Sequence, residues 1–181
     1  MISRSRLLGA ACAVSACLSA HAGLMGSFDV GSGAKAATLQ FDFENGNSWL
    51  ATVRWDGSLN GFQALQMVTA GVSGGQLQFQ SFSFGKFVTG IGVGSDWQYG
   101  EGDLWPVENW WHYWTAEATG DWTSSMIGAE DRVLQDGSRD GWVFGSGAAP
   151  AAIPGPGAAV LAGLWCARGR RRRSGSAIVS A

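Results

Sequence analysis

Three groups of residues in the chain have types and spacings that could do chemistry, and the first suggests a serine nucleophile. Gly71-Val72-Ser73-Gly74-Gly75 fits the G-x-S-x-G pattern, and Asp96 or Asp103 and then His112 follow it in the order of a hydrolase triad. That motif needs a strand before the serine and a helix after it, whereas a helical pattern precedes Ser73 and a strand pattern follows it. We therefore expect a turn here and no serine hydrolase.

The second group consists of two glycine-bearing runs that resemble ligand loops. Gly90-Ile-Gly-Val-Gly94 has the spacing of a phosphate-binding loop, but no helix N-terminus follows it and Asp96 would repel a phosphate, so a bend or loop is expected. Asp136-Gly-Ser-Arg-Asp-Gly141 matches the first half of a calcium loop. Its twelfth position is Gly147 instead of the bidentate acid, so a polar turn is expected.

The third group could supply the paired carboxylates of a glycoside hydrolase. Its members are Glu101, Asp103, Glu108 and Glu117. Nothing in the sequence fixes their separation, on which that mechanism depends. The three groups together predict no enzyme, no metal site and no cofactor.

Aromatic residues are the strongest signal. Six of the ten tryptophans lie between Trp105 and Trp142. In a strand over 110–116, Trp111 and Tyr113 would share one face, and Trp110, His112 and Trp114 would share the other. One face can enter a core, while the other is either covered or forms an exposed ligand platform. The candidate ligand contacts are Trp110, Trp111, Tyr113 and Trp114.

Hydrophobic periodicity predicts the elements that must position these residues. After a glycine-rich lead over 23–36, period-two alternation predicts a hairpin with a turn at Asn45-Gly46 and with Trp49, Ala51, Val53 and Trp55 facing inward. Ser58 or Asn60 can cap a helix through Ala70 that buries Phe62, Leu65 and Val68. An acidic loop is expected over 99–109. The predicted strands are 38–43, 49–55, 77–84, 87–93, 110–116, 122–127 and 141–144. This is an α+β pattern: one small domain with an antiparallel sheet and one short helix.

Charge and cysteine distribution narrow the function further. The chain has 181 residues and a formal net charge of −2, but all fourteen acidic and only five of the twelve basic residues lie between Gly23 and Ala149. An acidic body repels phosphate backbones, so no nucleic-acid partner is expected. Cys12, Cys17 and Cys166 are confined to the terminal segments, so the body can hold neither a disulfide nor a zinc–thiolate site.

The first 22 residues have the pattern of a secretory signal peptide. Arg4 and Arg6 precede a short apolar run, and Ala20 and Ala22 supply the small-x-small site for signal peptidase. The run is too short to span a bilayer. An alternative is lipidation at Cys17, because residues 14–17 resemble a lipoprotein box.

The C-terminal part has three further segments: a small-residue linker (145–152), a proline, apolar and arginine segment (153–173) and a tail (174–181). The proline motif, the apolar run 158–167 and the basic cluster stand in the order of a PEP-CTERM sorting signal, which this segment resembles, although Gly155 stands in place of the glutamate. The resemblance implies recognition by an exosortase-type transpeptidase and attachment to the membrane. Its key residues are Pro154, Pro156, Arg170, Arg171, Arg172 and Arg173.

The middle of the chain, residues 23–144, is the expected exported domain. Its strings Trp110-Trp-His-Tyr-Trp114, Gly120-Asp-Trp-Thr-Ser-Ser125 and Asp136-Gly…Asp140-Gly-Trp142 resemble the C-terminal domain of transcobalamin. That resemblance implies a β-grasp-like α+β fold, and some members of the family bind corrinoids.

The expected function is that of a non-catalytic, exported surface protein of the cell envelope or extracellular matrix. The alternative is a small-ligand module that binds a corrinoid or a glycan, such as an extracellular polysaccharide, through the aromatic strand. Burial of both faces of that strand would favour the first, and an exposed aromatic ladder the second.

Overall fold

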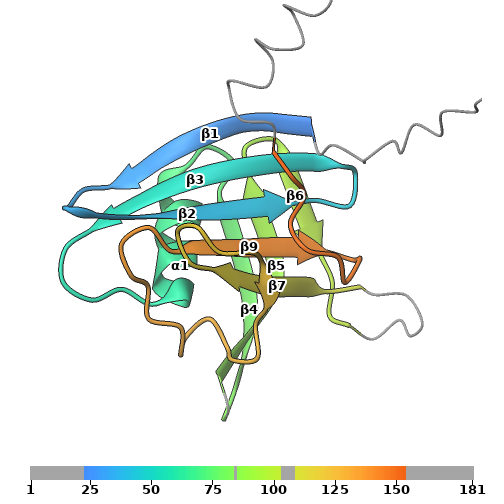
Figure 1. Cartoon of the computed structure of the whole chain (residues 1–181). Helices are drawn as coiled ribbons and strands as arrows, with labels where there is room; N and C mark the ends of the chain where they lie inside the picture. The colour runs from blue at the N-terminus through green and yellow to red at the C-terminus, as the bar shows by residue number, and fades with distance from the viewer. Residues whose placement is uncertain (1–22, 84, 103–108, 154–181) are drawn as a thin grey trace, which may run out of the picture.

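The computed structural model describes residues 23–83, 85–102 and 109–153, which form nine strands and one helix (Figure 1). The elements are β1 (Gly23–Gly31), β2 (Lys35–Asp42), β3 (Asn47–Trp55), α1 (Gly61–Gly71), β4 (Gln76–Phe82), β5 (Gly85–Val93), β6 (Asp96–Tyr99), β7 (Trp111–Ala116), β8 (Thr123–Ser124) and β9 (Arg139–Phe144). The predicted signal peptide and the sorting segment from Pro154 onward lie outside the described residues. Along the described chain, no helix is long and apolar enough to cross a membrane.

The strands form two sheets. One has six strands in the order β1-β3-β2-β9-β7-β8, and the other has three in the order β4-β5-β6. The fold is therefore a small β-rich domain with one short helix. The prediction of one antiparallel sheet is wrong, because β1 pairs with β3 and β2 pairs with β9 in parallel.

Strand β1 lies in the glycine-rich stretch over 23–36, for which the sequence predicted no strand. It lies at the edge of the larger sheet, and β3 lies between it and β2. The chain must therefore cross the end of β3 on its way from β1 to β2. Gly33 makes this crossing with a φ of +148°, and a Cβ there would lie 2.1 Å from the Trp55 carbonyl carbon. Only glycine fits such an approach.

Helix α1 follows its sequence signals closely. Asn60 is the N-cap: its side chain accepts a hydrogen bond from Gln63 N at 2.7 Å, and the Gln63 side chain accepts one from Asn60 N at 3.0 Å. This capping box satisfies two backbone donors that a helix start leaves free. Phe62, Leu65 and Val68 are buried, as predicted.

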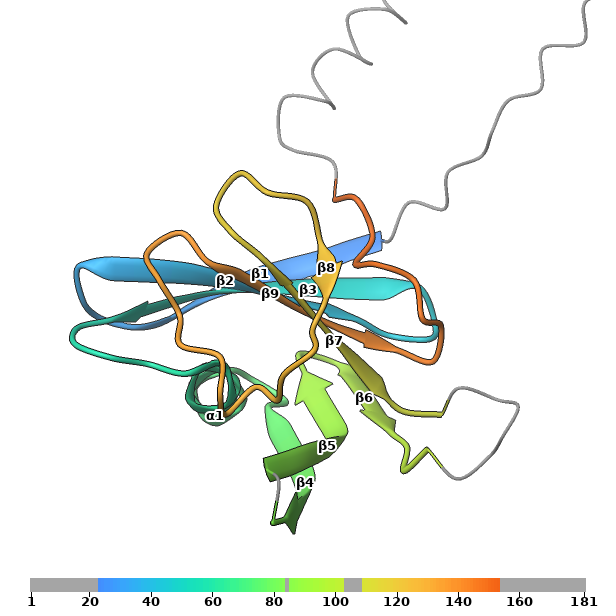
Figure 2. The same ribbon diagram turned by 60° about the horizontal axis from the view of Figure 1, so that its bottom comes forward.

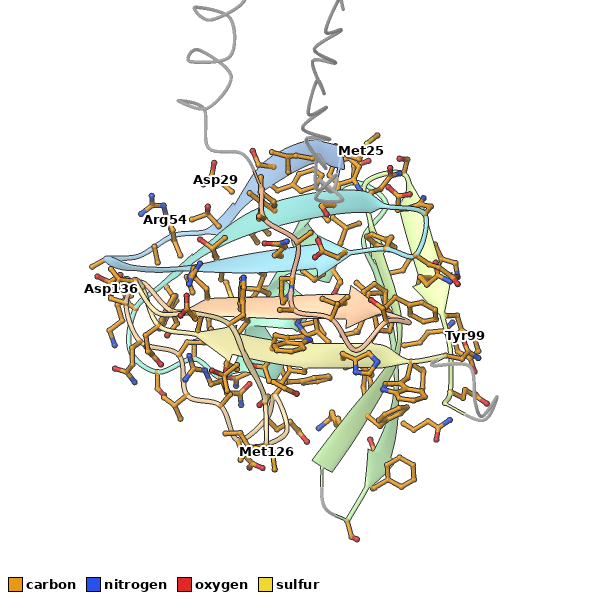
Figure 3. The ribbon with its side chains drawn as sticks, turned by 45° about the vertical axis from the view of Figure 1, so that its right-hand side comes forward. Met25, Asp29, Arg54, Tyr99, Met126 and Asp136 are labelled. Atoms are coloured by element: carbon orange, nitrogen blue, oxygen red, sulfur yellow. The ribbon has the colours of Figure 1, made fainter. Side chains whose placement is uncertain are left out.

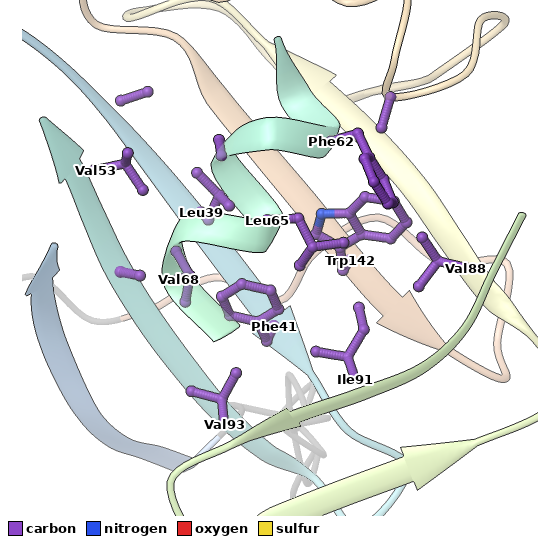
Figure 4. Packing of buried hydrophobic residues seen from close by; sticks show 14 of the residues in the cluster. Leu39, Phe41, Val53, Phe62, Leu65, Val68, Val88, Ile91, Val93 and Trp142 are labelled. Carbon is purple, nitrogen blue, oxygen red and sulfur yellow. The ribbon is translucent and has the colours of Figure 1, made fainter. Parts of the chain in front are cut away.

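The core lies between the inner face of the six-stranded sheet and a layer made of α1 and the three-stranded sheet (Figures 2 and 4). Leu39, Phe41 and Val53 from the larger sheet meet side chains of the helix and of β5. Trp49, Ala51, Val53 and Trp55 share the inward face of β3, as the alternation predicts, although Trp49 is only partly buried. Full burial contributes about 1.5–3 kcal/mol for each large aliphatic side chain.

The predicted linker (145–152) and Ile153 cross the outer face of the six-stranded sheet (Figure 2). Ala151 N donates to Asp42 Oδ2 at 2.7 Å, and Gln40 Nε2 donates to Ala151 O at 2.9 Å. Pro150 is buried against Gly141 of β9, where an added Cβ would lie 2.3 Å from the proline ring. This C-terminal segment (residues 145–153) therefore covers part of the sheet.

Candidate functional site

The predicted aromatic strand is β7, and its side chains alternate as expected. Trp111 is buried on the inner face and makes edge-to-face contacts with Phe43 and Phe144, each with ring centroids 5.3 Å apart. Tyr113, on the same face, stacks on Trp142 with centroids 4.6 Å apart. These contacts confirm that one face of the strand enters the core.

The opposite face of β7 is half-buried. The Trp110 and His112 rings lie 5.0 Å apart, and His112 Nε2 lies 3.1 Å from the carbonyl oxygen of Gly145, where the C-terminal segment begins. Trp114 is half-buried next to Gly141, the residue that Pro150 covers. Trp110, Trp111, Tyr113 and Trp114 are thus all buried or half-buried, so β7 does not present an exposed aromatic ladder.

Charged side chains meet beneath β7 and β9. Asp140 is fully buried; Tyr113 Oη donates to its Oδ2 at 2.5 Å, and Arg132 Nε lies 3.6 Å from its Oδ1. Arg132 also donates to Glu117 Oε1 at 3.1 Å. Burial raises the pKa of Asp140, and the hydrogen bond from Tyr113 and the charge of Arg132 offset only part of that rise. Burial likewise raises the pKa of Tyr113, and the Asp140 carboxylate adds to the increase.

This network positions the start of α1. Gly61 N donates to Arg132 O at 2.8 Å, and Phe62 N donates to Ala129 O at 2.9 Å. A Cβ on Gly61 would lie 2.5 Å from Tyr113 Oη. The network therefore joins the start of the helix to the sheet, and its role is structural.

The residues that match the order of a hydrolase triad have separate partners. Ser73 lies in the turn between α1 and β4, where its carbonyl accepts from Gly94 N at 2.8 Å. Asp96 accepts hydrogen bonds from Trp49 Nε1 at 2.7 Å and from two asparagine side chains. His112 lies near Gly145, on the outer face of β7. Asp103 lies outside the described residues.

The calcium-like run also fails to bring its oxygens together. Asp136 Oδ1 accepts from Ala36 N at 2.8 Å, Ser138 Oγ accepts from Gln135 N at 2.9 Å, and Asp140 belongs to the buried network. Within the described residues there is no group of three or more His, Cys, Asp or Glu side chains that could hold a metal ion. Glu101 and Glu117 each have their own polar partners, and Asp103 and Glu108 lie outside the described residues.

Among the described residues, the exposed aromatic side chains lie on the three-stranded sheet, which the sequence analysis did not identify as a candidate site. Phe79 and Phe82 of β4 and Trp97 and Tyr99 of β6 are each at least 38% exposed. Figure 3 places Tyr99 on the opposite side of the domain from Asp136. Gly90 and Gly92 lie in β5, not in the bend or loop that was predicted for them.

A groove of about 410 Å³ runs along this sheet between β4 and the end of β6. Tyr99 Oη and Gln80 Nε2 both donate to Glu101 Oε1, the second at 3.4 Å. The groove is lined by Leu77, Gln78, Phe79, Gln80, Thr89, Tyr99 and Glu101. The sequence does carry a signal for this face: glutamines alternate over 76–80, glycines over 90–94 and aromatic residues over 97–99.

No protein-family model matches the chain, and no curated protein is significantly similar to it. Among solved structures, a protein of Ruminococcus gnavus ATCC 29149, described as a "putative metal binding protein", is similar in fold, with a TM-score of 0.47 and 13% sequence identity. The match covers 64% of this chain and 100% of that one. A likeness this distant carries no argument about function.

Proposed function

We propose that this chain is an exported bacterial protein of the cell envelope or extracellular matrix that acts by binding, not by catalysis. The observation that carries the proposal is the arrangement of its two outer faces. The C-terminal segment is bound to the outer face of the six-stranded sheet, while the three-stranded sheet, on the other side (Figure 2), keeps Trp97 and Tyr99 exposed. Exposed aromatic patches on soluble domains are commonly binding sites.

This arrangement suits a domain that is attached through its C-terminus. In the proposal, signal peptidase cleaves after Ala22, and an exosortase-type enzyme recognises the segment from Pro154 to Arg173. The chain would then leave the domain on the side away from the three-stranded sheet. The groove on that sheet would remain accessible at the cell surface.

We also propose that the fold is β-grasp-like, with a sheet packed round one helix. The contacts of α1 with β1, β3, β4 and β5 support this arrangement. Of the two ligand classes considered, a glycan is favoured over a corrinoid, because a groove of about 410 Å³ suits one or two sugar rings better than a corrin macrocycle.

The experiment that tests export and attachment is fractionation of a bacterium that has an exosortase and produces the full chain. We expect a mature protein that begins at Gly23 and is found in the envelope or matrix fraction. A variant truncated after Ile153, and one with Arg170 to Arg173 replaced by alanine, should be exported without attachment. Cytoplasmic protein with an intact N-terminus would refute the proposal, and a mature chain that begins at Cys17 would replace simple cleavage with lipidation.

A further inference from the structure

Two glycines form the floor of the exposed face of the three-stranded sheet. Ile91 and Val93 of β5 point into the core, so Gly90 and Gly92 face the opposite way. The six-membered ring of Trp97 lies over both: an added Cβ would lie 2.5 Å from Trp97 Cη2 at Gly90 and 3.1 Å from Cε3 at Gly92. The ring thus occupies the space where side chains of β5 would stand.

Trp97 is nevertheless 38% exposed, so the side of the ring away from the glycines is available to a ligand. Its position is also fixed. Trp97 pairs with Gly92 across the β5–β6 ladder, and a ring that lies on backbone loses little further freedom when a ligand stacks on it. This is a preorganised flat apolar platform.

Polar side chains flank the platform on the same face. Gln76 pairs with Gly92 and Gln78 with Gly90 on one side of β5, and Tyr99 pairs with Gly90 on the other. Each glutamine offers two N–H donors and a carbonyl acceptor. The groove beside them adds the Gln80 amide and the Glu101 carboxylate.

The chemistry of this face indicates its ligand. A pyranose ring has apolar C–H faces that stack on an aromatic ring, and hydroxyl groups at its edge that need both donors and acceptors. Amide side chains supply both roles without net charge. The ionisable groups that line the groove are the Tyr99 hydroxyl and the Glu101 carboxylate, and a carboxylate disfavours phosphate, sulfate or uronate ligands.

We propose that the outward face of β4–β5–β6 binds a neutral polysaccharide chain. One sugar stacks on Trp97, and the next lies in the groove beside Tyr99, where Gln78, Gln80 and Glu101 form hydrogen bonds with its hydroxyls. This inference rests on the proposed binding function and names its ligand class.

The test is affinity electrophoresis through native gels of the mature protein, purified after export of the full chain. The gels contain mixed-linkage β-glucan, xyloglucan, galactomannan or soluble starch, with alginate as the anionic comparison. We expect at least one neutral polysaccharide to retard the protein, and Trp97→Ala to weaken that binding about tenfold or more, as for a central aromatic contact. Trp122→Ala is the matched control: Trp122 stacks with Arg139, outside the three-stranded sheet, so this variant should bind like the original chain.

Two further variants keep the test decisive if Trp97→Ala does not fold, as judged by circular dichroism. Gly90→Ala pushes the ring off its floor and should weaken binding, and Gln78→Ala should weaken it severalfold. Binding that survives all three substitutions would overturn the proposal, as would retardation by alginate alone or by no polysaccharide. A protein that reaches the envelope but binds no glycan would refute only this inference, whereas one that is not exported would refute the proposed function.

Discussion

Tyr113 and Asp140 are diagonal neighbours on the inner face of the β7–β9 pair, and Tyr113 Oη donates to Asp140 Oδ2 at 2.5 Å. Asp140 is fully buried, so this hydrogen bond and the nearby Arg132 guanidinium are what stabilise its carboxylate. The first residue of α1, Gly61, rests on the same pair. A tyrosine that the sequence suggested as a ligand contact is therefore part of the joint between helix and sheet.

The first prediction concerns this joint. Tyr113→Phe removes the donor and leaves a buried carboxylate oxygen without its hydrogen bond, so the free energy of unfolding should fall by about 1–3 kcal/mol. Urea denaturation measures the change. Tyr99→Phe is the matched control, because its hydroxyl bonds to the exposed Glu101 and its loss should change stability by less than about 0.5 kcal/mol. Equal effects of the two substitutions would contradict the assigned role of Tyr113.

The second prediction follows from the raised pKa of Asp140. Burial, the largest cause, places the folded-state pKa above the unfolded value of about 3.9. The folded state then binds the proton more tightly, so the contribution of Asp140 to stability is fully present below about pH 4 and is lost as the pH rises through the folded pKa. Asp140→Asn should remove this pH-dependent contribution. The free energy of unfolding of the variant should therefore decline less with rising pH than that of the original chain, as measured by urea denaturation from pH 3 upward.

Asp96 provides the comparison of opposite sign. Burial acts to raise its pKa, but hydrogen bonds from Trp49, Asn45, Asn47 and Ser95 outweigh burial and lower the pKa. Its contribution is therefore present above about pH 4 and lost as the pH falls through the folded pKa. In Asp96→Asn, the free energy of unfolding should fall less as the pH is lowered than it does in the original chain. In Asp140→Asn, it should fall more. Identical pH profiles for the two variants would contradict at least one of the two assignments.

Elements with strong local signals could be predicted from the sequence. The capping pair Asn60 and Gln63 fixes where α1 starts, and the alternation from Trp49 to Trp55 fixes which face of β3 is inward. Each signal depends on neighbours a few residues apart, so no knowledge of the rest of the fold was needed.

Pairing between distant strands could not be predicted in the same way. Strand β1 contains three glycines among the residues 23–31 that it spans, and its parallel partner β3 begins sixteen residues after β1 ends. The predicted strand over 122–127 shortens to Thr123–Ser124, because Met126 and Ile127 lie exposed beyond the pairing with β7. Neither outcome depends on local residue types alone.

The candidate site shows the same limit. Aromatic density drew attention to 110–114, but density does not distinguish a buried face from an exposed one. The C-terminal segment covers part of the outer face of the six-stranded sheet, and its partners Gln40 and Asp42 are more than a hundred residues away in the chain. The exposed aromatics lie instead on β4 and β6, and the distinguishing signals are the glutamines that alternate along β4 and the glycines that alternate along β5.

The last prediction concerns Asp42, which holds the C-terminal segment on the sheet. Its carboxylate accepts from Ser48 Oγ at 2.5 Å, from Ala151 N at 2.7 Å and from Gln40 Nε2 at 3.0 Å. Asp42→Ala leaves these donors without their acceptor, so the free energy of unfolding should fall by about 1–3 kcal/mol. Limited proteolysis within residues 145–153 should also become faster, because the segment detaches more often. Asp29→Ala, an exposed position on β1, is the matched control and should leave both measurements unchanged. Unchanged proteolysis in Asp42→Ala would mean that Pro150, packed on Gly141, holds the segment without Asp42.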